Sequence, residues 1–397
     1  MKQVLLAYIL PALLSVFAVY YSATSSSINA QLFPQTESLQ PAGEFTFIES
    51  FSGNKIYEDQ FLQDNDKYSN IFLLGSSELT GESPASPYNF ISGNYNTKVK
   101  AVGHAGNQCF SIYSQLLANS DRLKDARIVI ILSPMWFLSK EAAGTASPVF
   151  LEFNSENFLN RIVQNNPEND FERYENKRVS DMFSDFTSPS FALRQMHFEH
   201  ESSKSILHCG LYAPLIMADR MLFSIKSRIR PDPFIRSSVK RTKPEAEDRN
   251  INWDSLLTLT KNESLKNMTN NTWGINDDYF SEHIKGNTSK IKIGPAKYNY
   301  EMQDLGMLIR LLKENEADAS FIILPMNPYY YTNLQEADPL ISEMTKTVTE
   351  ADYNLLNLWV TATSQYEKGT LKDIMHLSDH GWHKVNRFIV ETYKLEK

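Results

Sequence analysis

The feature that most constrains the fold is a set of short apolar runs that stop abruptly at glycine, serine or proline. Ile71–Leu74 stops at Gly75, and a run over 127–132 stops at Ser133. Uninterrupted apolar runs of this length are typical of strands buried on both faces, as in parallel sheets. Five strands are therefore predicted, over residues 70–74, 98–102, 127–132, 319–324 and 353–358.

Helical periodicity occupies the gaps between these strands. Phe110, Tyr113 and Leu117 recur at helical spacing between the second and third strands, and residues 298–314 form a strongly amphipathic pattern. Further helices are predicted near 338–350 and after Gly381. Strands that alternate with helices predict an α/β fold, with a parallel sheet covered by helices on both faces in three layers.

The segment 138–295 has a weaker pattern and separates the first three strands from the last two. A structureless loop of that length is rare inside a compact domain. We therefore expect a large, mostly helical insertion. The chain of 397 residues is long enough for one large α/β domain that carries it.

The N-terminus predicts export. Residues 4–21 carry no charge, Lys2 precedes them, and the next charged residue is Glu37. Such a stretch can span a bilayer once, and Lys2 favours a cytoplasmic N-terminus. We expect an anchor over 1–22, a linker over 23–45 and an extracytoplasmic domain over 46–397, at the cell membrane. A cleaved signal peptide is the alternative, and it exports the same domain.

Charge and cysteines limit the partners. The net charge is −8, and zinc-finger, Walker and dinucleotide-binding spacings are missing, so neither nucleic acid nor a cofactor is expected. One stretch, 226–243, holds seven basic residues and one acid. It is either a solvated segment or a patch for a polyanion or anionic lipid. Cys109 and Cys209 are either a disulfide or two buried thiols.

Three residues suggest nucleophilic chemistry. Ser77 follows the first strand, at the edge where open α/β sheets place their sites. A serine hydroxyl needs a base to take its proton as it attacks. His376 can be that base and then an acid, while Asp373 would fix its tautomer and stabilise the imidazolium.

Other residues at the predicted strand ends complete the candidate site. The N–H groups of Gly106 and Ser77 can form an oxyanion hole, because glycine lets the backbone approach a substrate oxygen. A tight turn is the alternative reading of Gly106. The candidates for substrate contact are Glu78, His104, Asn107, Trp136 and Asn327.

A metal site is a weaker interpretation of the histidines near the second motif. His376, His380 and His383 cluster there with Asp379. Gly381 argues against one helix that carries all three histidines, so no metal is predicted, and His380 and His383 are expected at the surface or at a helix start.

These motifs resemble a known family. Gly75-Ser76-Ser77-Glu78-Leu79, Gly103 to Gln108, Ser133 to Phe137 and Asp373-x-x-His376 come in the order of the SGNH/GDSL hydrolase blocks. Nearly the whole chain is similar to the DltD family of teichoic-acid D-alanylation. That likeness adds Asn271 to Ile275, the helix around Glu301 to Leu312, Pro325 to Tyr330 and the single N-terminal span.

The resemblance implies an SGNH-like three-layer domain outside the membrane, with Ser77, Asp373 and His376 as a triad. It also implies a membrane-bound O-acyltransferase and a D-alanyl carrier protein as partners, and teichoic acid or a similar anionic envelope polymer as acceptor. Acyl transfer is the first hypothesis. The others are an esterase or thioesterase and a docking protein without catalysis.

Two departures from the SGNH pattern matter. The third block normally offers an Asn side chain to the oxyanion, but Met135 or Trp136 occupies that stretch here. A second oxyanion donor is therefore not identified. Ser76 stands where the pattern has Asp, so Ser77 is preferred over Ser76 as the nucleophile.

Overall fold

The computed structural model describes residues 45–48, 70–81, 83–154, 169–182, 235–237, 251–269, 272–286, 290–294 and 299–396. The chain divides into two compact units. One comprises Glu44–Phe153 and Pro233–Lys397, and the other comprises Met1–Gly43 and Asn154–Asp232. Helix α9 (Asp170–Met182) belongs to the second unit. Every other element described below belongs to the first.

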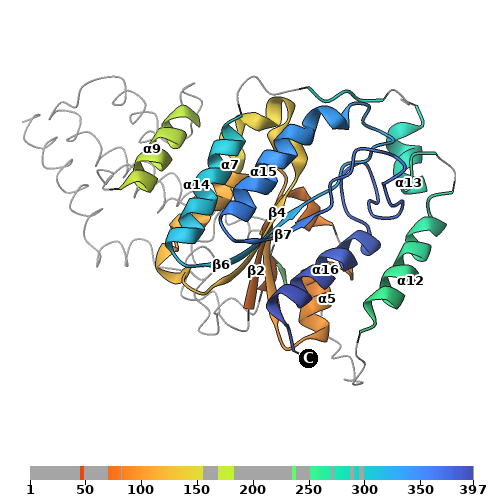
Figure 1. The fold of residues 1–397 in the computed structure, drawn as a ribbon, viewed down its shortest axis with the longest axis horizontal. Helices are drawn as coiled ribbons and strands as arrows, with labels where there is room; N and C mark the ends of the chain where they lie inside the picture. Colours follow the sequence, from red (N-terminus) through yellow and green to blue (C-terminus); the bar gives the residue numbers. More distant parts are fainter. Residues whose placement is uncertain are drawn as a thin grey trace, which may run out of the picture. The chain divides into compact units, whose positions relative to one another are not determined.

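A single sheet organises the first unit (Figure 1). Among the described residues its strand order is β5-β1-β3-β2-β4-β6-β7. Neighbouring strands are parallel, except that β5 runs antiparallel to β1. The strands are β1 (Phe45–Ile48), β2 (Asn70–Gly75), β3 (Lys98–Gly103), β4 (Arg127–Leu132), β5 (Ile235–Ser237), β6 (Asp318–Ile323) and β7 (Asn354–Asn357).

The five predicted strands are confirmed to within about a residue at each end as β2, β3, β4, β6 and β7. Every residue of β2 is buried, as its uninterrupted apolar run predicts. The edge strand β7 has a half-exposed pattern instead. Strands β1 and β5 were not predicted, and β1 starts at the last residue of the expected linker.

Helices cover both faces of the sheet, which confirms the predicted three layers. Ile71 and Leu73 pack on one face with α5 (Pro87–Asn94) and α16 (Asp379–Tyr393). Phe72 and Leu74 alternate with them and point to the opposite face. There α6 (Cys109–Leu117) contacts α14 (Tyr300–Glu314), and α14 contacts α15 (Asp338–Glu350).

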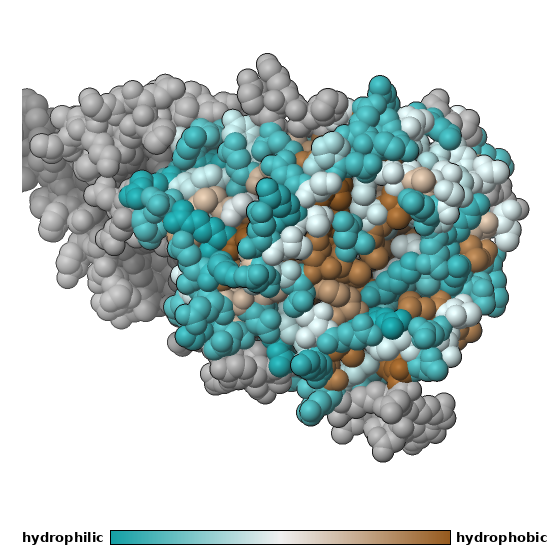
Figure 2. Space-filling model, in the orientation of Figure 1, coloured by the Kyte–Doolittle hydropathy of each residue, from teal (hydrophilic) through white to brown (hydrophobic). Residues whose placement is uncertain are grey.

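The helices are amphipathic, which explains why they lie on the sheet. Figure 2 shows hydrophilic side chains over the outward surface and hydrophobic side chains in the furrows between them. Polar caps fix where two helices begin. The Asn299 side chain accepts from the Met302 N–H at the start of α14, and the Ser378 side chain accepts from the Gly381 N–H at the start of α16.

The described part of the segment 138–295 is mainly helical. It contains η5 (Ser139–Ala143), α7 (Ser147–Phe153), α12 (Trp253–Lys266), α13 (Asp277–Tyr279) and a π-helical turn, η6 (Phe280–Ile284). It also contains α9 of the second unit and strand β5. Helix α12 packs against α16.

The predicted anchor and most of the basic stretch fall outside the described residues. Residues 1–22 and most of 226–243 are not among those described, and neither is Cys209. Within the described ranges, none of the helices has the length and hydropathy needed to cross a bilayer.

Candidate active site

Ser77 lies on a tight turn at the carboxyl end of β2. The strand ends at Gly75, and a 3-10 turn, η2 (Ser77–Thr80), begins two residues later. The buried Glu78 side chain folds back so that its Oε1 accepts a hydrogen bond from the Ser76 N–H at 2.6 Å. A Cβ on Gly75 would overlap this carboxylate, so a larger residue at the strand end would displace the Glu78 side chain.

The partners of Ser77 come from a loop just before α16. Residues 369–378, which we call the Asp–His loop, are closed by backbone hydrogen bonds. The Lys372 N–H donates to the His376 carbonyl at 2.9 Å, and the Ser378 N–H donates to the Thr370 carbonyl at 3.0 Å. Leu371 and Leu377 form an antiparallel bridge. Asp373 and His376 therefore lie at the tip of a closed hairpin.

The structure brings the three predicted side chains together. Ser77 Oγ lies 3.0 Å from His376 Nε2, although the two residues are 299 positions apart. His376 Nδ1 lies 2.8 Å from Asp373 Oδ2. Asp373 Oδ1 accepts from the N–H groups of Met375 and His376 at 2.9 and 2.7 Å. This is the arrangement in which an imidazole can take a proton from a serine hydroxyl.

Electrostatics adjust the imidazole and its carboxylate in opposite directions. Burial raises the pKa of Asp373, but the hydrogen bond and charge of His376 outweigh it and hold that pKa below its ordinary value. Burial lowers the pKa of His376, but Asp373 and then Glu78 outweigh it, so the His376 pKa lies above its ordinary value. The pair therefore favours an imidazolium, as a base that has taken a proton requires.

Glu78 was predicted to touch substrate, but the structure places it beneath the turn. Its side chain is buried, and burial raises its pKa despite the Ser76 and Glu78 N–H groups and the charge of His376. Its described contact is with the Ser76 backbone. Glu78 therefore supports the turn that presents Ser77, and its charge acts on His376 from below.

The predicted oxyanion donor Gly106 is engaged by a neighbouring hydroxyl. Gly106 has φ +88°, a conformation that suits glycine, and its N–H donates to Ser76 Oγ at 3.0 Å. Ser76 Oγ in turn donates to the His104 carbonyl at 2.9 Å. Ser76 thus ties the turn after β2 to the loop after β3. Its proton is already donated, which leaves Ser77 as the serine that faces the imidazole.

Two asparagines predicted to contact substrate act as struts instead. Asn107 is fully buried, donates to the Gly75 carbonyl at 2.9 Å and accepts from Gln115 at 3.0 Å. Asn327 is also fully buried and donates to the Trp273 carbonyl at 2.9 Å. The Asn327 N–H donates to the Ile374 carbonyl at 3.1 Å, which ties the end of β6 to the Asp–His loop.

The last two candidates differ in exposure. Trp136, on the turn η4 (Pro134–Phe137) after β4, is 6% exposed and so presents little surface to a ligand. His104 is half-exposed and lies directly after β3, so it keeps access to solvent at the edge of the sheet where Ser77 lies.

Sequence reasoning missed Lys372, although it directly precedes Asp373. Its positive charge lowers the pKa of His376, and its Nζ lies next to Gly81 at the end of the Ser77 turn. Among the described residues, the exposed Lys372 ammonium has no carboxylate partner. It also lines a cavity of about 230 Å³ with polar residues that include Asn267, Asn276 and Asp379.

Tyrosine side chains surround Asp373 and were also missed. Burial, and then the charge of Asp373, raises the pKa of Tyr279. Burial likewise raises the pKa values of Tyr331 and Tyr366, with a further contribution from Asp373 in each case. These phenols therefore stay neutral, and the Asp373 side chain behind His376 is itself only 8% exposed.

Cys109 is a buried free thiol in the structure, while its possible partner Cys209 lies outside the described residues. Burial and then the charge of Glu301 raise the pKa of the Cys109 thiol well above its ordinary value, which makes it unreactive. Within the described ranges no group of three His, Cys, Asp or Glu side chains is placed to hold a metal.

Comparisons with known proteins agree over nearly the same length. The chain is 23% identical over 356 residues to Protein DltD of Staphylococcus aureus, an alignment that covers 84% of this chain and 83% of that protein. It is 22% identical over 365 residues to Protein DltD of Bacillus subtilis, with 86% of each chain covered. Protein DltD of Lacticaseibacillus rhamnosus is 22% identical over 346 residues, with 82% and 78% covered.

A model of one protein family, described as DltD protein, matches residues 47–394. That range starts in β1 and ends just after α16, so it contains Ser77, Asp373 and His376 and all of the sheet except the first two residues of β1. Because the match covers most of the chain, the protein belongs to the DltD family.

Proposed function

We propose that this protein transfers an acyl group, D-alanyl, to a hydroxyl of teichoic acid or a related anionic polymer of the cell envelope. The observation that carries the proposal is the continuous contact from Ser77 Oγ through His376 to Asp373. Family membership supplies the acyl group and the polymer. The domain would work outside the cell, held at the membrane by a single N-terminal span.

The chemistry divides into two balanced steps. In the first, His376 takes the Ser77 proton as Oγ attacks the acyl carbonyl of the donor, and it then returns that proton to the departing donor group. In the second, an acceptor hydroxyl attacks the Ser77 ester and His376 takes the new proton. His376 then returns it to Ser77 Oγ as the ester bond breaks. Asp373 holds the ring with Nε2 toward Ser77 throughout.

Negative charge on the carbonyl oxygen would be met by the N–H groups of Ser77 and Gly106. The Gly106 N–H now donates to Ser76 Oγ, so an incoming oxyanion would compete with that hydroxyl. A negatively charged oxygen accepts a stronger hydrogen bond than a neutral hydroxyl does, so the Gly106 N–H would turn from Ser76 Oγ to the oxyanion. The Ser133 to Phe137 stretch offers no Asn side chain as a further donor.

Lys372 suggests the approach of the acceptor. Its ammonium stands beside the triad and faces the cavity lined by Asn267, Asn276 and Asp379. A phosphodiester would pair with the ammonium, and polyol hydroxyls would bond to the amide and carboxylate side chains. The donor would come from a membrane-bound O-acyltransferase that receives D-alanine from its carrier protein.

Hydrolysis is the second candidate, favoured by solvent access. The His376 side chain is 30% exposed, so water can reach the base that would activate it. A transferase must exclude water from the Ser77 ester, and the acceptor or the acyltransferase partner would do this by covering the site. In the presence of the acceptor polymer, an esterase would still release free D-alanine, whereas a transferase would pass the D-alanyl group to the polymer.

The test is ester-linked D-alanine released by mild base from envelopes of cells with wild type, Ser77→Ala or Ser76→Ala as the only copy. We expect loss with Ser77→Ala and partial retention with Ser76→Ala, at equal protein levels. Normal D-alanine content in the Ser77→Ala cells would contradict catalysis and favour a docking role. Free D-alanine from purified protein and a D-alanyl ester would favour the esterase.

A further inference from the structure

The Asp–His loop is closed by its own backbone hydrogen bonds, but it is not part of a helix or of the sheet. It follows β7, and a stretch without strand or helix runs from Leu358 to the start of α16 at Asp379. Such stretches have several accessible conformations unless side chains fix them. A base that must lie 3.0 Å from Ser77 Oγ therefore needs an external anchor. One such contact, from the Asn327 N–H to the Ile374 carbonyl, has been described above, and the structure contains a further anchor at the base of the loop.

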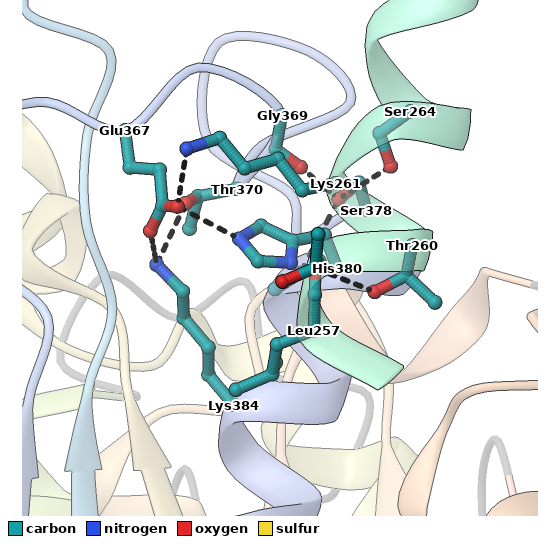
Figure 3. Close-up of polar contacts among 12 residues, drawn as sticks. Leu257, Thr260, Lys261, Ser264, Glu367, Gly369, Thr370, Ser378, His380 and Lys384 are labelled. Atoms are coloured by element: carbon teal, nitrogen blue, oxygen red, sulfur yellow. Dashed lines mark hydrogen bonds and ion pairs between the residues drawn. The ribbon is translucent and has the colours of Figure 1, made fainter. Parts of the chain in front are cut away.

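Glu367 is the centre of this anchor (Figure 3). Its Oε1 lies 2.8 Å from Lys261 Nζ of α12, and its Oε2 pairs with Lys384 Nζ of α16. Lys384 Nζ also donates to Thr370 Oγ1 at 3.1 Å, within the Asp–His loop itself. One carboxylate thus joins two helices to the residue where the loop begins. We call Glu367, Lys261, Lys384 and Thr370 the Glu367 clamp.

Close packing extends the clamp to the far end of the loop. Ser378 Oγ donates to the Gly369 carbonyl and lies 3.5 Å from Ser264 Oγ of α12. A side chain on Gly381 would overlap the Thr370 carbonyl, so the first turn of α16 lies directly on the loop. Both ends of the loop, at 369–370 and at 378, therefore rest on the same two helices.

Glu367 stays ionised over the physiological range. Burial raises the pKa of Glu367, but the hydrogen bonds from Lys261 and Lys384 outweigh it and lower that pKa to about 2. The Glu367 side chain is 36% exposed and that of Lys384 only 22%. Ion pairs that are partly shielded from water are weakened less by salt than exposed ones.

A third side chain faces the same carboxylate. His380 of α16 is 2% exposed, and its Nε2 lies 3.4 Å from Glu367 Oε1. Burial and the charge of Lys384 lower the pKa of His380. At neutral pH the His380 side chain is therefore uncharged, and it contributes packing against Glu367 rather than an ion pair. The two lysines are the groups that hold Glu367.

We propose that Glu367 is a positioning residue that holds the Asp–His loop, through Lys384 and Lys261, at the distance from which His376 reaches Ser77. The inference rests on the proposed function, in which His376 activates Ser77. Because Asp373 and His376 bond to each other within the loop, loss of the clamp moves them together. It separates His376 from Ser77 while the His376–Asp373 contact remains.

Two measurements on full-length protein in detergent micelles test this. The first is amide hydrogen exchange over residues 369–378, which reports the loop without any chemistry. The second is the rate at which a fluorophosphonate phosphonylates Ser77, with loss of fluoride, as a function of pH. We expect Glu367→Gln and Lys384→Met to speed exchange and to slow phosphonylation about 10- to 100-fold.

The pH midpoint of that reaction separates positioning from electrostatics. In Glu367→Gln and Lys384→Met it should stay near the wild-type value, because the His376–Asp373 pair is intact. Lys384→Arg keeps a cation on Glu367 and should restore both readouts. Glu314→Gln is the matched control, since it breaks the 2.8 Å Arg310–Glu314 pair on α14 and should change neither.

Unchanged exchange over 369–378 in both Glu367→Gln and Lys384→Met would overturn the proposal, whatever the labelling rate. If Glu367→Gln fails to fold, Lys384→Met decides alone, since Glu367 then keeps Lys261. If wild type itself is not phosphonylated, the proposed function fails, and exchange still decides whether the clamp fixes the loop.

Discussion

Ser77 is held by the sheet, whereas His376 lies on a loop that is fixed by contacts outside the sheet. The turn after β2 continues a buried central strand, so backbone hydrogen bonds to β3 and β4 fix Ser77. The Asp–His loop follows the half-exposed edge strand β7 and depends on the Glu367 clamp and the Asn327–Ile374 contact. The two halves of one site can therefore have very different local stability.

The largest expected effect tests the contact within the loop. Asp373→Asn keeps the size of the side chain but lets His376 adopt the wrong tautomer and removes the charge behind it. We expect Ser77 phosphonylation to fall roughly 10³- to 10⁴-fold. Because Asp373 raises the His376 pKa, the pH midpoint should also fall. A midpoint that does not move would show that Asp373 has no electrostatic role.

A matched pair of glycine substitutions compares the two halves directly. A Cβ on Gly103 would overlap the Gly75 carbonyl in the sheet, and a Cβ on Gly381 would overlap the Thr370 carbonyl at the loop. Overlap of this kind costs about 1–3 kcal/mol of folding free energy. We expect Gly103→Ala to lower the unfolding temperature more, and Gly381→Ala to lower Ser77 reactivity more, because the loop can yield. A larger loss of Ser77 reactivity in Gly103→Ala and a larger fall in unfolding temperature in Gly381→Ala would contradict the difference in stability between the two halves.

The pH dependence of wild type is a third, smaller test. His376 must be neutral to accept a proton, so Ser77 reactivity should rise with pH through the His376 pKa. That pKa lies above the ordinary 6.5 because of Asp373 and Glu78, so the midpoint should lie above 6.5. The measurement is phosphonylation rate against pH. A midpoint below 6.5 would mean that burial dominates.

The smallest expected effect concerns Lys372. Its charge lowers the His376 pKa, so Lys372→Met should shift the midpoint slightly to higher pH without a change in the limiting rate. The apparent affinity for a polyol phosphate acceptor should fall in the same variant. Lys368→Met is the control, because that residue contacts the Tyr329 ring rather than the cavity. Equal loss of affinity in both variants would argue against a role for Lys372 as an anion anchor.

The sequence predicts those features that depend on residues close together in the chain. Uninterrupted apolar runs identify β2, β4 and β6, and Ser77 follows directly from the end of one of them. Strands β1 and β5 were missed because they are short, and β5 lies in a basic stretch where its apolar signal is one isoleucine. Such short strands are defined by their partners rather than by their own residues.

Contacts between distant residues account for most of what was missed at the site. No sequence motif links the distant residues Lys261, Glu367 and Lys384, so the Glu367 clamp is recognised only in the folded structure. His380 and His383 were correctly expected at a helix start, but they are 2% and 6% exposed rather than at the surface. Asn107 and Asn327 were predicted to contact substrate. From sequence alone that role is not distinguished from a buried hydrogen bond to the backbone, because an asparagine side chain serves both.

The separation of Ser77 from His376 by 299 positions also orders events during synthesis. A chain emerges N-terminal part first, so the strands around Ser77 are available for pairing long before α16 is made. Until α16 docks, Ser77 does not have the His376 imidazole beside it, so the proposed nucleophile is an ordinary hydroxyl. In the proposed function, the protein would thus be protected from unwanted acylation of its own serine while it is still unfinished.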